Sequence, residues 1–315
     1  MTPLPAFAGI VGQDRAVAQL QATLAQPRHA YLLVGLPGVG KTTLATAWAM
    51  ALFCRDRTGC GACTECRTFL HGNYVDFHLW EPAGRSTSIE QMRDLVRQAE
   101  LAPYRGTHQV HVVFADTLTL PAANCLLKTL EEPPPGTILI LLAQSLADVL
   151  PTIVSRCQRV ACHPVPEADI DSWLVARHGA TPEQAAIAAR RAAGRIGYSL
   201  ALLTQEDTPP RLLVARDLLE ALDEGDRAAA LPLDKQLQTL EDLMLMVRDA
   251  LMLARTGRED RVDQPGTARQ LGSTGRSPDA WFRILGLLDA SRQRLHAGAS
   301  PKLTWAVTAR EIALT

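Results

Sequence analysis

One short stretch combines the residue types that hold phosphate groups. The apolar run Tyr31–Val34 leads directly into the pattern Gly35-x-x-x-x-Gly40-Lys41-Thr42, and apolar residues at helical spacing follow it. In a strand, loop and helix of this kind, backbone N–H groups and the positive end of the helix dipole face phosphate oxygens. The lysine reaches the outer phosphates and the threonine hydroxyl can bind Mg²⁺. A nucleotide site is therefore predicted at these residues: Gly35, Pro37, Gly38, Val39, Gly40, Lys41, Thr42 and Thr43.

A second group with possible chemistry is a set of thiols just beyond that helix. Its members are Cys54, Cys60, Cys63 and Cys66. The N-terminus lacks the layout of a signal peptide and no run of about 18 apolar residues occurs, so we expect a cytoplasmic protein without a membrane span, in which disulfides are disfavoured. Closely spaced thiolates can surround a tetrahedral ion, which predicts a closed structural Zn²⁺ site. Reduced surface thiols are the alternative. The remaining cysteines are expected to be buried apolar side chains: Cys125, Cys157 and Cys162.

Length and composition set the scale of the molecule. The 315 residues are 47% hydrophobic and 21% charged, which is enough for a large core and favours two or three domains. The formal net charge of -1 gives no overall electrostatic reason to bind nucleic acid alone. Proteins are therefore the expected partners.

Strands and helices are expected to alternate through the first half of the chain. After Tyr31–Val34, strands are predicted at 76–80, 110–114 and 137–143, with helices at 15–24, 88–102 and 121–130. Such alternation favours an α/β fold with a parallel sheet and helices on both faces. A ligand should then lie at the carboxyl edge of the sheet, where the glycine-rich loop already is.

From Pro166 onward the pattern is helical. Three helices are predicted at 167–178, 182–193 and 198–204, followed by a linker at Thr208–Pro210. Further helices are expected at 212–223, 232–254, 279–296 and 302–314, with a mobile polar loop at 257–275.

Several motifs together resemble one known family. They are Val11-Gly-Gln13, the glycine-rich loop, the four cysteines, the run Asn124–Pro134 and Ser155-Arg156-Cys157. With these motifs the chain resembles bacterial clamp-loader subunits, the AAA+ proteins of the DNA polymerase III holoenzyme that place the sliding clamp on primed DNA. The resemblance implies ATP with Mg²⁺ as the ligand. It also implies a ring of five subunits with gamma/tau and delta as partners, in which primed DNA is met only as part of the complex.

The same resemblance implies three domains. Residues 1–165 would form a RecA-like AAA+ P-loop domain with the cysteine module, 54–66, inserted into it. Residues 166–207 would form a three-helix lid, and residues 208–315 an all-α collar for oligomerisation.

Two types of subunit carry these motifs, the ATP-hydrolysing gamma/tau type and the delta-prime type. Hydrolysing subunits place an Asp-Glu pair after the third strand, where the Asp supports Mg²⁺ and the Glu polarises water. Counting back from Leu126 puts that pair near Val113 and Phe114, and the nearest acid, Asp116, is followed by Thr117. At most half of the pair is present.

The lid departs from the hydrolysing type as well. Its sensor is expected as Gly-x-x-Arg, but Gly194-Arg-Ile-Gly197 has glycine at the arginine's place, and Arg195 lies two residues early. The chain also stops at the collar without the long tail of tau. The delta-prime type is therefore expected, with ATP bound but hydrolysed poorly. The alternatives are a gamma/tau-type ATPase and an AAA+ regulator or chaperone outside replication, which would leave the cysteine module unexplained.

One residue is expected to act outside its own subunit. In this family the arginine of Ser-Arg-Cys reaches across the interface into the neighbour's ATP site, so the resemblance implies an arginine finger at Arg156. The alternative for Arg156 is an ordinary surface salt bridge.

Overall fold

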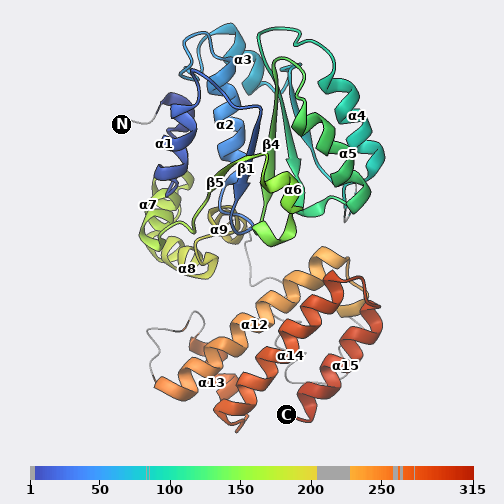
Figure 1. Cartoon of the computed structure of the whole chain (residues 1–315). Coiled ribbons are helices and arrows are strands. Elements are labelled where there is room, and N and C mark those ends of the chain that lie inside the picture. The colour runs from blue at the N-terminus through green and yellow to red at the C-terminus, as the bar shows by residue number, and fades with distance from the viewer. Residues whose placement is uncertain are drawn as a thin grey trace. The chain divides into compact units, whose positions relative to one another are not determined.

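A five-stranded parallel sheet forms the centre of the N-terminal half (Figure 1). The computed structural model describes residues 4–82, 84, 86–203, 228–257, 262, 265–272 and 274–315. The strands are β1 (Ala30–Val34), β2 (Phe77–Trp80), β3 (Gln109–Phe114), β4 (Thr137–Ala143) and β5 (Gln158–Ala161). Their order is β2-β3-β4-β1-β5, so β1, which leads into the glycine-rich loop, lies between β4 and β5.

Helices cover both faces of this sheet. They are α1 (Asp14–Ala22), α2 (Lys41–Phe53), α3 (Thr64–Leu70), α4 (Ile89–Ala99), α5 (Leu120–Glu131) and α6 (Pro151–Val154), with 3₁₀ turns η1 (Pro5–Phe7), η2 (Ala115–Thr117) and η3 (Leu146–Asp148). Alternate residues of β1 point to opposite faces: Leu33 packs with α1 and α2, and Leu32 packs with α4 and α5. The buried, nearly continuous apolar strands follow from this two-sided cover.

Three short helices follow β5 and have a small core of their own. They are α7 (Glu167–His178), α8 (Pro182–Ala192) and α9 (Ile196–Leu203). Alanines from α8 pack against Ile170 and Leu174 of α7, because small side chains let the two helices approach closely. Thr181 caps α8 in a capping box with Gln184.

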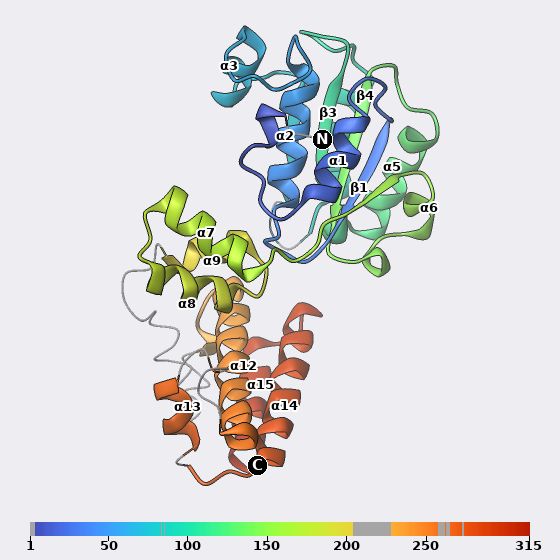
Figure 2. The same cartoon turned by 90° about the vertical axis from the view of Figure 1, so that its left-hand side faces the viewer.

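The C-terminal unit is entirely helical in its described part. Its helices are α12 (Leu233–Thr256), α13 (Pro265–Gly272), α14 (Pro278–His296) and α15 (Pro301–Ala313), of which α12, α14 and α15 lie side by side (Figure 2). Trp281 and Trp305 fill the core. The buried indole N–H of Trp305 donates to Gln236 at 3.0 Å, which satisfies a polar group that would otherwise be costly to bury. The chain divides into two compact units, Met1–Leu203 and Thr204–Thr315.

The predicted fold class is confirmed, with three local corrections. Residues 158–161, which were not predicted as a strand, form β5. The segment before Ser155, for which no helix was predicted, contains the helix α6, since Pro151 is favourable in its first turn. The predicted loop 257–275 contains α13.

Three predictions lie outside the described residues: the linker at 208–210, the helix at 212–223 and the border at 207/208. Among the described helices, none has the length and apolar composition needed to cross a bilayer.

Candidate functional site

The glycine-rich loop is fixed by the strands on both sides of it. The N–H of Gly35 donates to the carbonyl of Ala143 at 3.1 Å, where β4 ends. A side chain at Gly35 could not be accommodated, because a Cβ there would lie 2.3 Å from the carbonyl oxygen of Cys162 beyond β5. Gly38 and Gly40 have φ angles of 78° and 100°, in the left-handed region that favours glycine. The backbone thus turns tightly from β1 into α2 at the carboxyl edge of the sheet.

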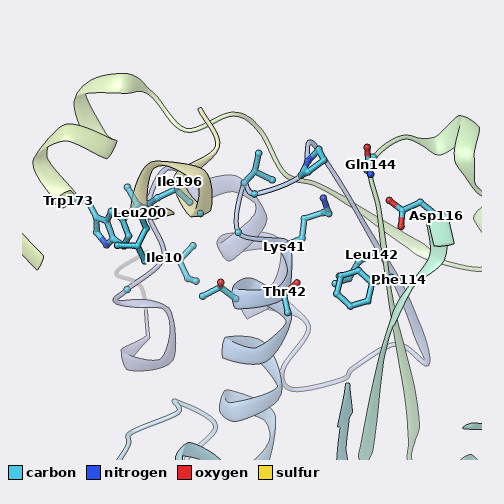
Figure 3. Close-up of a pocket in the computed structure, with 18 residues that line it drawn as sticks. Ile10, Lys41, Thr42, Phe114, Asp116, Leu142, Gln144, Trp173, Ile196 and Leu200 are labelled. Atoms are coloured by element: carbon cyan, nitrogen blue, oxygen red, sulfur yellow. The ribbon is translucent and has the colours of Figure 1, made fainter. Parts of the chain in front are cut away.

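A cavity of about 530 Å³ opens beside this loop (Figure 3). Its lining comes from the N-terminal segment, the loop and start of α2, the ends of β3 and β4, and the α7–α9 unit. The residues are Gly9, Ile10, Val11, Pro37, Gly38, Val39, Gly40, Lys41, Thr42, Thr43, Phe114, Asp116, Leu142, Gln144, Trp173, Ile196, Gly197 and Leu200. Ile10, Trp173 and Leu200 gather at one end, and Lys41, Asp116 and Gln144 stand toward the other. The cavity therefore has an apolar end and a polar end. All predicted loop residues except Gly35 line it.

Lys41 lies at the polar end and contacts its own loop. Its ammonium group donates to the carbonyl oxygens of Gly35, at 2.5 Å, and Leu36, at 3.0 Å. Burial lowers the pKa of Lys41, and the charges of Asp116 and Cys162 act in the opposite direction. The side chain is thus placed where it can exchange carbonyl oxygens for those of a phosphate.

Asp116 is the only carboxylate among the described residues that line the cavity. It lies in η2, directly after β3, and burial raises its pKa while the Lys41 charge lowers it. Val113 is buried in the sheet and Phe114 lines the cavity with an aromatic ring. The hydroxyl of Thr117 bonds to that of Thr87, at 2.8 Å. The site therefore has one carboxylate, that of Asp116, which lies just C-terminal to the positions counted for the Asp-Glu pair. Thr117 follows it in place of a second acid.

The α7–α9 unit closes the apolar end without a charged group. The N–H of Gly197 donates to the carbonyl of Gly38 at 2.8 Å. At the position where the hydrolysing type has its sensor arginine, the backbone of this chain thus contacts the loop directly. Arg195 turns away: its guanidinium lies over the ring of Tyr198, 4.6 Å from the centroid, and its Nε donates to Ala192. Within the described part of this unit, no basic side chain lines the cavity.

Several lining residues were not among the predicted site residues. Gln144 follows β4 immediately, so its place at the carboxyl edge of a predicted strand was a usable signal. Asp116 was noted only as the nearest acid. Trp173 and Leu200 carried no signal, because their position depends on how the three-helix unit packs against the loop.

The four predicted cysteine ligands come together after α2. All four sulfur atoms lie within 4.8 Å of one another. Backbone N–H groups point at three of the sulfurs: Cys60 N–H at Cys54 (3.5 Å), Cys63 N–H at Cys60 (3.4 Å) and Cys66 N–H at Cys63 (3.4 Å). All seven cysteines are free thiols, of which Cys162 is buried and Cys125 and Cys157 are half-buried.

This arrangement fits a tetrahedral metal ion. Zinc–sulfur bonds of about 2.3 Å place sulfurs roughly 3.8 Å apart, and the Cys54 and Cys63 sulfurs lie 4.0 Å apart. Left-handed φ angles at Gly59 and Gly61, 65° and 72°, turn the chain so that its N–H groups face the sulfurs. Burial raises the pKa of the Cys54 thiol, but backbone N–H groups, that of Cys60 foremost, outweigh this effect and lower the pKa to about 6. The pKa of Cys66 is shifted upward instead, by burial first and then by the neighbouring Cys63 and Cys54 thiols.

Arg156 lies away from the cavity of its own chain. It follows α6, and its Nη2 forms an ion pair with Glu131 at the end of α5, at 2.5 Å. Its Nη1 donates to the carbonyl of Thr152, at 2.8 Å, and to the hydroxyl of Ser155, at 3.3 Å. The structure therefore gives Arg156 no role at the cavity that its own subunit forms.

Comparisons with known proteins identify the family of the chain. Residues 12–166 match the family model described as DNA polymerase III, delta subunit. The delta-prime subunit of Escherichia coli DNA polymerase III is 32% identical over 90% of this chain and 86% of that protein. The chain belongs to the delta-prime family. A Bacillus subtilis delta-prime subunit is 27% identical over 91% of this chain and 92% of its own length.

Two further relatives match about half of this chain. The Pseudomonas aeruginosa delta-prime subunit is 40% identical over 48% of both chains, and the E. coli tau subunit is 40% identical over 48% of this chain and 24% of its own. Identity in the shared half therefore does not separate the two types, whereas the long delta-prime matches do. Among solved structures, a gamma-subunit-related protein of Thermotoga maritima has a TM-score of 0.48 at 17% identity, over 94% of this chain and 97% of its own.

Proposed function

We propose that this delta-prime family member is a clamp-loader subunit that binds ATP, turns it over slowly, and supplies Arg156 to the ATP site of a neighbouring gamma/tau subunit. In this proposal it joins gamma/tau and delta in a ring of five, which loads the sliding clamp onto primed DNA in the cytoplasm. Residues 1–165 act as the ATPase domain, 166–207 as the lid and 208–315 as the collar. The relatives named delta-prime and tau support a place in DNA polymerase III.

The observation that carries the proposal is the incomplete polar end of the cavity. The loop N–H groups, Lys41 and Thr42 suit the phosphates and Mg²⁺, and Ile10, Trp173 and Leu200 suit the flat face of a base. Hydrolysis needs further groups that orient water and stabilise the charge that develops on the γ-phosphate. Asp116 can support Mg²⁺, but the described lining has no second carboxylate and no lid arginine. Binding energy without those groups lowers the barrier little.

Calorimetry and steady-state turnover of the isolated chain test the two halves of this proposal. We expect saturable ATP binding and little phosphate release. Absence of ATP binding would overturn the first half. Robust turnover that is lost in Lys41→Ala would instead support a gamma/tau-type ATPase, the second candidate, which the position of Asp116 at the cavity favours.

The four clustered cysteines support a further part of the proposal, a structural Zn²⁺ ion. Four thiolates would fill all positions of a tetrahedral ion, so the metal would have no open site for catalysis. What the ion supplies is folding free energy for the segment between α2 and α3. The backbone N–H groups of Cys60, Cys63 and Cys66 hold the sulfurs in place and stabilise their negative charge.

A further inference from the structure

Arg156 is held by its own subunit through three contacts. Glu131 accepts from Nη2, while the carbonyl of Thr152 and the hydroxyl of Ser155 accept from Nη1. The side chain of Arg156 is 34% exposed and that of Glu131 is 51% exposed. Of the five guanidinium N–H donors, these three bonds leave two for another acceptor.

Glu131 is the one contact in this set that joins two different helices. It is the last residue of α5, and Arg156 follows α6, so the ion pair connects the ends of two elements that pack together. Within the described part of the chain, no other carboxylate is within ion-pair distance of Arg156. Thr152 and Ser155 are neighbours in sequence and restrain only the local turn.

We propose that Glu131 is a positioning residue, which holds the guanidinium of Arg156 in the orientation that it needs toward the neighbour's ATP. This inference rests on the proposed role of Arg156 in trans. An unrestrained arginine side chain loses rotamer entropy when it engages a phosphate. A carboxylate on a helix end reduces that loss beforehand, because it fixes one edge of the planar fork and leaves the rest exposed.

The test is a double-mutant cycle in the reconstituted clamp loader with clamp and primed DNA. Steady-state ATPase is measured for wild type, Glu131→Gln, Arg156→Ala and the double variant, and the difference between wild type and Arg156→Ala defines the arginine-dependent rate. Glu131→Gln keeps the size of the side chain and removes its charge. Glu132→Gln is the matched control, because Glu132 is adjacent and exposed and makes no ion pair with any described residue.

We expect Glu131→Gln to lower the arginine-dependent kcat about two- to fivefold, the range that an exposed ion pair can supply. The KM for ATP should stay unchanged, since the arginine acts on the transition state. Glu131→Gln should have no further effect when Arg156 is already alanine, and Glu132→Gln should match wild type.

Each other outcome is decisive. If Arg156→Ala lowers the rate and Glu131→Gln does not, or raises it, the positioning role is wrong while the trans role stands. If Glu131→Gln lowers the rate equally in the Arg156→Ala background, Glu131 acts on structure and not through the arginine. If Arg156→Ala itself has the wild-type rate, the proposed trans role of the arginine fails first.

Discussion

Lys41 donates to two carbonyl oxygens of its own loop, and a phosphate would have to replace them. A charge-assisted hydrogen bond contributes about 1.5–3 kcal/mol, so Lys41→Ala should weaken ATP binding roughly 10- to 100-fold. Gly35 is half-buried and Leu36 is exposed, so water can satisfy their carbonyls once the ammonium is gone. The free energy of unfolding should therefore change little. Calorimetry of ATP binding, beside a denaturant titration, checks both statements, and unchanged affinity would contradict the first.

Gly35 is required for stability, because there is no space beside it for a side chain. A Cβ 2.3 Å from the carbonyl oxygen of Cys162 meets backbone, which cannot move aside as a flexible side chain can. Gly35→Ala should lower the free energy of unfolding by about 1–3 kcal/mol. Gly106→Ala is the control, because a Cβ there meets nothing within 4 Å, and it should stay within about 0.5 kcal/mol of wild type. Equal denaturation midpoints for the two variants would show that β5 can shift to accept the methyl group.

At the scale of elements, the segment between α2 and α3 depends on its four sulfurs. We expect one zinc per chain by metal analysis of protein purified without chelator. Removing it with a strong chelator should lower the melting temperature by at least about 4 °C, since each kcal/mol corresponds to roughly 2–4 °C in domains of this size. Cys63→Ser should lose zinc, and Cys125→Ser, at a cysteine outside the cluster, should keep it. Purified protein without zinc would remove the metal from the proposal.

A buried histidine, His111, connects two neighbouring strands of the sheet through side-chain hydrogen bonds. The ring of His111 is fully buried; its Nδ1 accepts from the Trp80 indole at 3.2 Å, and its Nε2 bonds to Gln109 at 3.1 Å. Gln109 in turn donates to the carbonyls of Ala99 and Leu101, which connects β2 and β3 to the end of α4. An imidazole that accepts at Nδ1 must be neutral. Burial, and secondarily the charge of His78, lowers the pKa of His111 to about 3.

The pH dependence of stability follows from that lowered pKa. In the unfolded chain the group titrates near 6.5, so between pH 6.5 and about 3 the unfolded state binds the proton and the folded state does not. The contribution of His111 to stability is thus complete above pH 6.5 and is lost as the pH falls toward 3, with a slope of at most about 1.4 kcal/mol per pH unit. Denaturant titrations from pH 7 to 4 should show a smaller slope for His111→Gln. Equal slopes for His111→Gln and wild type would contradict this prediction.

These elements also show what a sequence can and cannot predict. The apolar runs of β1, β3 and β4 are buried on both faces, so they were predictable from composition alone. β5 was missed because it is a short edge strand in which only Val160 is buried. The cysteines and the glycine-rich loop are local in sequence, and their positions followed from spacing. The apolar end of the cavity was not predictable, because Trp173 and Leu200 reach it only through the packing of separate helices.

At the scale of the whole molecule, the chemistry is gathered in one of the two units. Every residue that lines the cavity lies between Gly9 and Leu200, and the cysteine cluster and Arg156 lie in the same unit, Met1–Leu203. The described helices of the second unit bury their own tryptophans. With 32 basic and 33 acidic residues, the chain has no excess charge to hold DNA on its own. The proposed function therefore predicts a division of work, in which the first unit binds ligand and the second serves assembly.

A fragment of residues 1–203 tests that division. Because it keeps both sheet cores and the whole cavity lining, it should bind ATP within about twofold of the full chain and retain zinc, as calorimetry and metal analysis would show. It should fail to enter the complex in gel filtration with gamma/tau and delta, because the proposed collar is missing. Full-length Arg156→Ala is the control, since it should assemble normally while lowering the ATPase rate of the complex. If the fragment binds zinc but loses ATP affinity more than tenfold, the second unit contributes to nucleotide binding; if the fragment assembles, oligomerisation does not depend on the collar.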